Sequence, residues 1–281
     1  AVHPSINGVA GGQTSGTALV TFNAPAFCSY GRDQSLNAPV SRYAAFAYTA
    51  ALNCLLADRE HLYRVGETTI LFWAKSGQPA FQDFFAAMAF GGTACYDAGT
   101  LGGMLKSLLE GKPVLYDETR LDPGMDFYIL GISPNAARLS VRFFLRNSFG
   151  GFLGNGQRHN DRLEINRHAN DSFESIPPWK LVDATVNQNS KDKSPSPVMT
   201  GEVLRAILTE TPSPVSLLTG VTLRIRADHK VARTRAAILK AYYLKKPHPD
   251  IPKEVLTVSL HPACDTPAHV LGRRFSVYEA I

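Results

Sequence analysis

The 281-residue sequence lacks most of the features that place a chain in a specialised class. Its four cysteines are scattered without a Cys-x-x-Cys pair, so neither a disulfide framework nor a zinc site is indicated, and reduced thiols in a cytoplasm are expected. An apolar run of about 18 residues, as a membrane span requires, does not occur. The phosphate-cradling Gly-x-x-x-x-Gly-Lys-Ser/Thr, Gly-x-Ser-x-Gly and His-Glu-x-x-His patterns are also missing, so the common hydrolase and NTPase classes have no support.

The residues that remain as candidates for catalysis are few. The glycine-dense segment 150–156 lacks the spacing of a dinucleotide-binding fingerprint, so we predict a flexible turn there. Next to it, His159 is followed by Asp161 and Glu164, and helical spacing would put the two carboxylates together. Such a group on a polar helix is usually solvent-facing, and the converging carboxylates of a metal-dependent nuclease are not evident. We therefore expect no catalytic residue, no metal and no cofactor.

The charge balance is moderately basic. The 29 Lys and Arg residues exceed the 24 Asp and Glu residues, for a formal net charge of +5. This value permits an anionic partner such as nucleic acid, but does not require one.

The most informative stretch is residues 29–41, Ser-Tyr-Gly-Arg-Asp-Gln-Ser-Leu-Asn-Ala-Pro-Val-Ser. Leu19–Phe22 before it has the composition of a strand. After Ser41, apolar residues recur at helical spacing, which predicts a helix with one core face. Asn37 or Ser41 is expected to cap that helix. The stretch is thus a polar loop between two anchored elements.

The side chains of this loop suit nucleic-acid recognition. Carboxamides such as those of Gln34 and Asn37 pair with base edges, the Arg32 guanidinium pairs with guanine or phosphate, and Tyr30 can stack on a base or wedge between two bases. Ser35 belongs to the same candidate surface. A structural alternative remains open from the residues alone, with Asn37 as a cap, Gln34 solvated and Tyr30 in the core.

Elsewhere the pattern predicts an α+β fold, in which a mixed α/β part with a small sheet precedes a mainly helical carboxy-terminal part. We divide it into residues 1–147 (α/β core with the loop), 148–197 (polar connection and linker) and 198–281 (helical part). Strands are expected at 68–74, 127–132 and 139–145, and helices at 101–110, 179–186, 201–209, 214–227, 231–246 and 267–281. We predict that the rest of residues 77–123 is a variable insertion.

Two groups of basic residues are candidates for contacts with phosphates. Arg138, Arg142 and Arg146 have even spacing on a predicted strand and should share one of its faces, with Asn135 at the turn before them. These arginines would attract phosphate.

Arg226, Lys230 and Arg233 form the second group, and helical spacing puts them on one side of a helix. A solvated basic face near a helix end is the structural alternative for this group.

The loop, with Thr21–Asn23 before it and the Ala/Tyr/Leu-rich helix after it, resembles the signature of the large subunit of type I-C CRISPR effector (Cascade) complexes. Two later blocks, Ile132–Phe143 and Val270–Phe275, are similar to that family in the same order, and His3–Gly8 and the strand Thr68–Trp73 also fit. Two departures are Arg32, where Lys is expected, and Arg274, where an apolar residue is expected.

This resemblance implies a non-catalytic, cytoplasmic nucleic-acid-binding subunit of an antiviral ribonucleoprotein. The subunit would help recognise the target-adjacent motif (PAM), open duplex DNA and stabilise the R-loop, while the guide RNA (crRNA) reads sequence by base pairing. The implied partners are RNA-coating backbone subunits, a 5′-end-binding subunit, a small helical subunit and a recruited helicase-nuclease. The family also implies that the chain is a piece of a longer protein, with an amino-terminal region before it and a helical bundle after it.

Two alternatives belong to other classes. One is a stand-alone DNA-processing enzyme, a metal-dependent nuclease or recombinase that uses the region of His159, Asp161 and Glu164. The other is a scaffold whose loop contacts neighbouring proteins rather than bases.

Overall fold

The computed structural model describes residues 3–22, 24–58, 62–91, 96–136, 138–167, 171, 173, 175–191, 193–258 and 263–279. The predicted α+β class is confirmed. In chain order the elements are η1 (Pro25–Phe27), η2 (Gln34–Asn37), α1 (Arg42–Ala57), β1 (Leu62–Val65), β2 (Thr68–Ala74), α2 (Pro79–Phe90), α3 (Ala98–Leu109), β3 (Val114–Tyr116), β4 (Thr119–Leu121), β5 (Asp126–Asn135), β6 (Arg138–Ser148), α4 (Phe149–Leu163), α5 (Pro178–Asp183), α6 (Pro197–Thr209), α7 (Val215–Asp228), α8 (Arg233–Lys245), η3 (Lys253–Val255) and α9 (Pro267–Glu279), where η marks a short 3-10 helix.

The centre of the molecule is an antiparallel sheet with strand order β1-β2-β5-β6. The strands predicted at 68–74, 127–132 and 139–145 are confirmed as β2, β5 and β6. A strand was also expected at Leu19–Phe22, and that expectation is wrong. Among the described residues next to this stretch, Ala18 pairs with β6, its carbonyl accepting from the Leu139 backbone N–H at 3.0 Å, and the chain bends directly afterwards.

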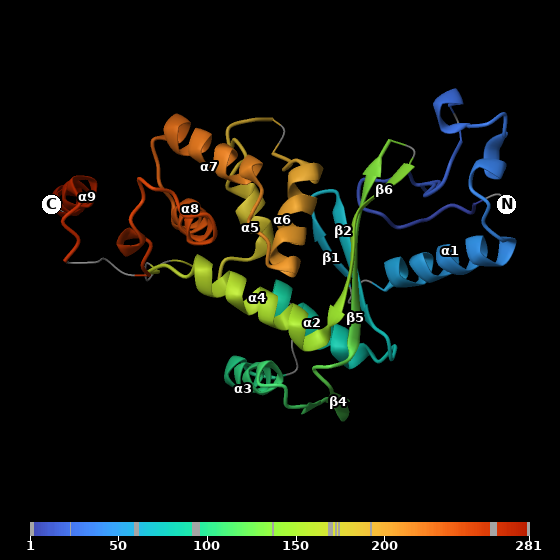
Figure 1. Cartoon of the computed structure of the whole chain (residues 1–281), viewed down its shortest axis with the longest axis horizontal. Helices are drawn as coiled ribbons and strands as arrows, with labels where there is room; N and C mark the ends of the chain where they lie inside the picture. The colour runs from blue at the N-terminus through green and yellow to red at the C-terminus, as the bar shows by residue number, and fades with distance from the viewer. Residues whose placement is uncertain are drawn as a thin grey trace.

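The sheet separates two hydrophobic cores. Its larger core lies against the helical layer and includes Phe72, Phe127 and Phe149, all buried. The smaller core lies on the opposite face, where α1 and the amino-terminal segment cover part of the sheet. Figure 1 shows this arrangement, with α1 on one side of the sheet and α4 to α8 on the other. Residues from each of the three predicted segments contribute to the larger core, and the division into segments stays a prediction.

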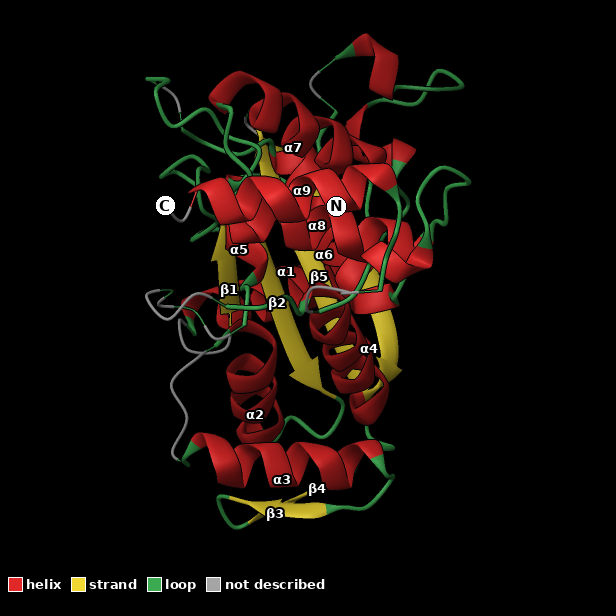
Figure 2. Ribbon diagram, turned by 90° about the vertical axis from the view of Figure 1, so that its left-hand side faces the viewer, coloured by secondary structure: helices red, strands yellow, loops and turns green. Residues whose placement is uncertain are grey.

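The segment 77–123 is not an irregular insertion, because most of it forms regular secondary structure. It forms α2, which was missed, then α3, which was predicted at 101–110, and the β3–β4 hairpin that Figure 2 shows beside α3. Most of the α2 side chains are apolar, and Phe81, Phe84 and Phe85 are all buried. A helix buried on most of its faces lacks the polar stripe by which helices are recognised in a sequence.

The glycine-dense segment 150–156 is also not a turn, because it lies within α4. Ser148 caps this helix by accepting the Gly151 N–H at 3.1 Å. Phe152 and Leu153 anchor α4 in the core, and the helix packs against α6 and α8. Burial of its apolar side chains outweighs the low helix propensity of its glycines.

The predicted carboxy-terminal helices are confirmed as α5 to α9, with small differences at their ends and with residues 280 and 281 outside the described part. Across the described ranges, no helix combines the length and the apolar character needed to cross a membrane.

Candidate nucleic-acid interface

The loop of residues 29–37 has a defined conformation that Asn37 holds closed. Its side-chain Oδ1 accepts the Ser29 backbone N–H at 2.8 Å, and its Nδ2 donates to the Arg32 carbonyl at 2.8 Å. Tyr30 (φ +54°) and Gly31 (φ +65°) both take the left-handed conformation at the tip. The α1 cap comes from Ser41, which accepts the Ala44 N–H at 3.0 Å, so of the two predicted caps it is Ser41 that caps the helix.

This closed loop presents side chains to solvent. Tyr30 is 97% exposed and is therefore not a core residue, and Arg32 is exposed beside it. Ser35 is half-buried, and its carbonyl accepts the Ala38 N–H at 3.2 Å. The side chain of Gln34 lies outside what the structure describes. The loop thus exposes an aromatic ring at its tip and a guanidinium two residues further on.

The tip of the β5–β6 hairpin lies next to the segment that precedes the loop. The Arg138 guanidinium stacks over the Phe27 ring, 4.1 Å from its centroid. Asn135 is exposed at the end of β5, beside the left-handed Ala136. Two of the predicted residues from this hairpin are therefore brought to the same end of the molecule as the loop, as Figure 1 shows.

The sequence reasoning missed two aromatic residues at the start of α1. Tyr43 is 80% exposed and Phe46 is 65% exposed, one helical turn apart and adjacent to the loop. A signal was present, because α1 has a single charged residue, Arg42, and therefore has apolar residues on its outer face as well as on its core face.

Arg138, Arg142 and Arg146 do not share one face of β6, contrary to prediction. A bulge lies where Gly131 pairs with Phe143 and the next residue pairs with Val141, so Arg142 is an extra residue. Such an insertion reverses the alternation of faces. Arg142 consequently lies against α6, where it donates to Ser133 Oγ at 2.5 Å, and Arg146 lies on the opposite face.

Arg226, Lys230 and Arg233 do not form a stripe on one helix, which corrects the second basic group. α7 ends at Asp228, because His229 takes a left-handed conformation (φ +51°), and α8 begins at Arg233.

Of these three residues, Arg226 and Lys230 are exposed. Arg233 is tied to Asp171 Oδ2 at 2.9 Å and to the Phe173 carbonyl at 2.7 Å. The group lies near α7 and α8, at the end of the molecule away from the loop (Figure 1).

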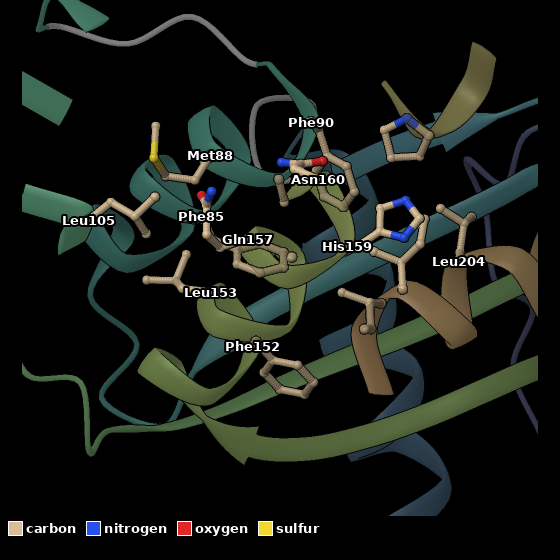
Figure 3. Close-up of a pocket in the computed structure, with 15 residues that line it drawn as sticks. Phe85, Met88, Phe90, Leu105, Phe152, Leu153, Gln157, His159, Asn160 and Leu204 are labelled. Atoms are coloured by element: carbon tan, nitrogen blue, oxygen red, sulfur yellow. The ribbon is translucent and has the colours of Figure 1, made fainter. Parts of the chain in front are cut away.

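His159, Asp161 and Glu164 do not converge on a common point. His159 points into an apolar pocket between α2, α4 and α6, where Phe85, Leu153 and Leu204 are among its neighbours (Figure 3). Asp161 is exposed and accepts from Gln157 Nε2 at 2.7 Å, and the Glu164 backbone carbonyl accepts from Lys240 Nζ.

Burial lowers the pKa of His159 to about 3, with a further contribution from the charges of Arg162 and Lys245. Its Nε2 is buried without a hydrogen-bond partner among the described residues. Among all the residues that the structure describes, no three His, Cys, Asp or Glu side chains are grouped closely enough to hold a metal ion.

Comparison with known proteins identifies the family. The whole chain, residues 1–281, matches the family described as CRISPR-associated protein (Cas_Csd1). The chain therefore belongs to this family of CRISPR-associated proteins, which agrees with the resemblance of its loop and central blocks. A search of curated proteins found no match.

Proposed function

We propose that this chain is the large subunit of a type I-C CRISPR effector complex, and that it binds nucleic acid without cleaving it. It helps recognise the motif beside the target (PAM), open the DNA duplex and stabilise the R-loop, while the guide RNA pairs with the target strand. The proposed partners are the RNA-coating backbone subunits, the 5′-end-binding subunit and the small helical subunit. Cleavage is assigned to the recruited helicase-nuclease.

The observation that carries this proposal is the conformation of the loop at residues 29–37. Tyr30 is held at the tip in a left-handed conformation and is 97% exposed, which costs free energy and leaves a large ring without packing. Strain of this kind is concentrated at functional sites. The chain belongs to a CRISPR-associated family, and this membership supports nucleic acid as the ligand of the loop.

Each side chain then has a separate role. Tyr30 wedges between base pairs or stacks on a base, Arg32 binds a phosphate, and Gln34 reads base edges. Asn37 holds the loop closed through its two hydrogen bonds, and a direct contact between Asn37 and a base stays a prediction. Asn135 and Arg138 of the neighbouring hairpin contact the duplex backbone.

The test is a selection with the assembled complex. Target duplexes are randomised at the positions beside the guide-paired segment, and the bound fraction is sequenced for wild type, Tyr30→Ala, Arg32→Gln and Gln34→Ala. We expect wild type to enrich a short motif and Gln34→Ala to lose that enrichment. Arg32→Gln should weaken all sequences about equally, because a phosphate contact carries no sequence information.

Two outcomes would contradict the proposal. If all three variants enrich the same motif with wild-type affinity, the loop is not the reader. If the variants instead fail to assemble with the other subunits, the loop is a protein contact, as in the scaffold alternative. Ser190→Ala, in the polar segment before α6, serves as a control variant outside the proposed interface.

A further inference from the structure

A compact triangular array of three aromatic rings lies on the sheet face opposite the helical layer, with all three pairs of ring centroids within 6.3 Å. Trp73 of β2, Tyr128 of β5 and Phe144 of β6 lie on neighbouring strands. The rings of Trp73 and Tyr128 are stacked at 5.7 Å with an interplanar angle of 15°, and those of Tyr128 and Phe144 at 6.2 Å with an angle of 18°. The planes are therefore nearly parallel within these two pairs, whereas the planes of Trp73 and Phe144 are tilted by 32°.

This array is open to solvent at Phe144. Phe144 belongs to β6, the last strand of the sheet order, and it is 58% exposed although Tyr128 and Trp73 contact it. Aromatic side chains that only hold a sheet together are usually covered. The exposed ring of Phe144, at the sheet-edge side of this array, offers a flat surface on which a further ring can stack.

Two cations lie next to this array, beside Tyr128 and the neighbouring Asp126. The Arg146 guanidinium lies 5.9 Å from the Tyr128 ring centroid and donates to Asp126 Oδ2 at 2.9 Å. Lys75 Nζ reaches the same carboxylate at 3.5 Å. Two cations thus share one carboxylate, and their side chains are 61% and 67% exposed. The net positive charge beside an aromatic surface is complementary to a phosphate backbone.

We propose that this aromatic array, together with Arg146 and Lys75, binds unpaired nucleotides of a nucleic-acid strand. A base stacks on the exposed face of Phe144, and the adjoining phosphate binds Arg146 and Lys75. Stacking accepts every base, so the site holds a strand without reading its sequence. The inference rests on the proposed function in one respect, because a complex that opens duplex DNA produces such a strand.

The test uses the tryptophan of the array as its own reporter. The chain contains two tryptophans, so Trp179→Phe leaves Trp73 as the single emitter. The purified chain in this background is titrated with oligo-dT and with oligo-U of about 10 nucleotides, within the usual range of site sizes. We expect quenching of the Trp73 fluorescence, and affinity that falls with added salt.

Variants at Phe144 test the stacking itself. Phe144→Ala should weaken binding about tenfold, as for loss of one base–aromatic stack. Phe144→Leu is the matched control, because it keeps apolar volume without a ring and should bind as weakly as Phe144→Ala. Phe144→Tyr should retain the wild-type affinity. The high exposure of Phe144 means that these changes leave the core intact, which thermal unfolding checks.

The outcomes are distinct. Stronger quenching by oligo-dT supports the displaced DNA strand as the ligand, and stronger quenching by oligo-U supports RNA. Absence of quenching, or equal affinity for the Ala, Leu and Tyr variants, would overturn the inference. The inference would also be wrong if Phe144→Ala caused a protein subunit to dissociate from the complex while the affinity for the single strand stayed unchanged. The oligonucleotides contain no duplex and no flanking motif, so this result is independent of the motif selection.

Discussion

The side chain of Asn37 spans the loop that presents Tyr30 and Arg32. Its two hydrogen bonds join Ser29 and Arg32 across the left-handed tip. In the sequence, Asn37 suited either base reading or helix capping. Its contacts give it a third role, which is to fix the conformation of the loop.

Replacing Asn37 by Ala should loosen this loop. Each lost hydrogen bond contributes about 0.5–1.5 kcal/mol to the closed form, so we expect trypsin to cleave after Arg32 about tenfold faster than in wild type. Asn37→Asp keeps an acceptor for the Ser29 N–H but loses the donor to the Arg32 carbonyl, and should be cleaved at an intermediate rate. Identical rates for the three proteins would rule out this role.

His159 makes stability depend on pH. Burial holds its folded-state pKa at about 3, whereas a histidine in an unfolded chain has a pKa of about 6.5. The unfolded state therefore binds more protons between these values, so the free energy of unfolding contributed by neutral His159 is fully present above pH 6.5 and falls as the pH is lowered toward 3.

We expect His159→Leu to remove this component. When the pH is lowered from about 7.5 to 5, the free energy of unfolding should fall by about 2 kcal/mol more in wild type than in the variant. Urea unfolding at both pH values measures this difference. His159→Gln cannot ionise either and should show the same pH dependence as His159→Leu. A wild-type pH dependence equal to that of both variants would contradict a buried neutral imidazole.

At the scale of elements, α4 illustrates how tertiary contacts decide the role of a glycine. A Cβ at Gly150 would lie 2.9 Å from Pro123 Cβ and 3.3 Å from the Pro123 carbonyl oxygen. A Cβ at Gly156, in the same helix, would meet nothing within 4 Å. The two glycines therefore differ in function, although both occur in one glycine-dense segment of the sequence.

Alanine at these two positions should have opposite effects on stability. Gly156→Ala should stabilise the protein by about 1 kcal/mol, because alanine is the better helix former and no contact opposes it. Gly150→Ala should destabilise it by about 1–3 kcal/mol, because the helix must move away from Pro123. Denaturant unfolding measures both, and a shift in the same direction for the two variants would contradict this explanation.

At the scale of the whole molecule, the exposed cations assigned to phosphate contacts lie at two ends. Arg32 belongs to the loop beside α1, and Arg226 and Lys230 lie where α7 ends and α8 begins. Contact with both groups requires a nucleic acid that extends along the molecule. The salt dependence of binding measures how many of these contacts form.

Affinity falls with salt, so the slope of log affinity against log salt is negative. We expect Arg32→Gln to reduce the magnitude of this slope by about 1, and the double variant Arg226→Gln/Lys230→Gln to reduce it by about 2. The assembled complex on target duplex is the material for this measurement. Lys112→Gln is the control, since Lys112 is exposed but paired with Glu110 at 2.8 Å. An unchanged slope in the double variant would place α7 and α8 outside the path of the nucleic acid.

Elements with an unambiguous residue composition could be predicted from the amino-acid sequence alone. Runs of β-branched and aromatic residues gave β2 and β5, because such runs fit a buried pleated surface. Ser41 could be predicted as a cap, and the carboxy-terminal helices followed from apolar spacing. The loop at residues 29–37 was identified from its side-chain chemistry and its resemblance to the family.

Features that depend on residues far apart in the chain became evident only in the folded structure. The bulge opposite Gly131 put Arg142 and Arg146 on opposite faces, and strand pairing brought Trp73, Tyr128 and Phe144 into one array. Local sequence fixes periodicity, but strand register and helix packing depend on burial free energy summed over the whole fold. For this reason the loop could be predicted from the sequence, and the aromatic array could not.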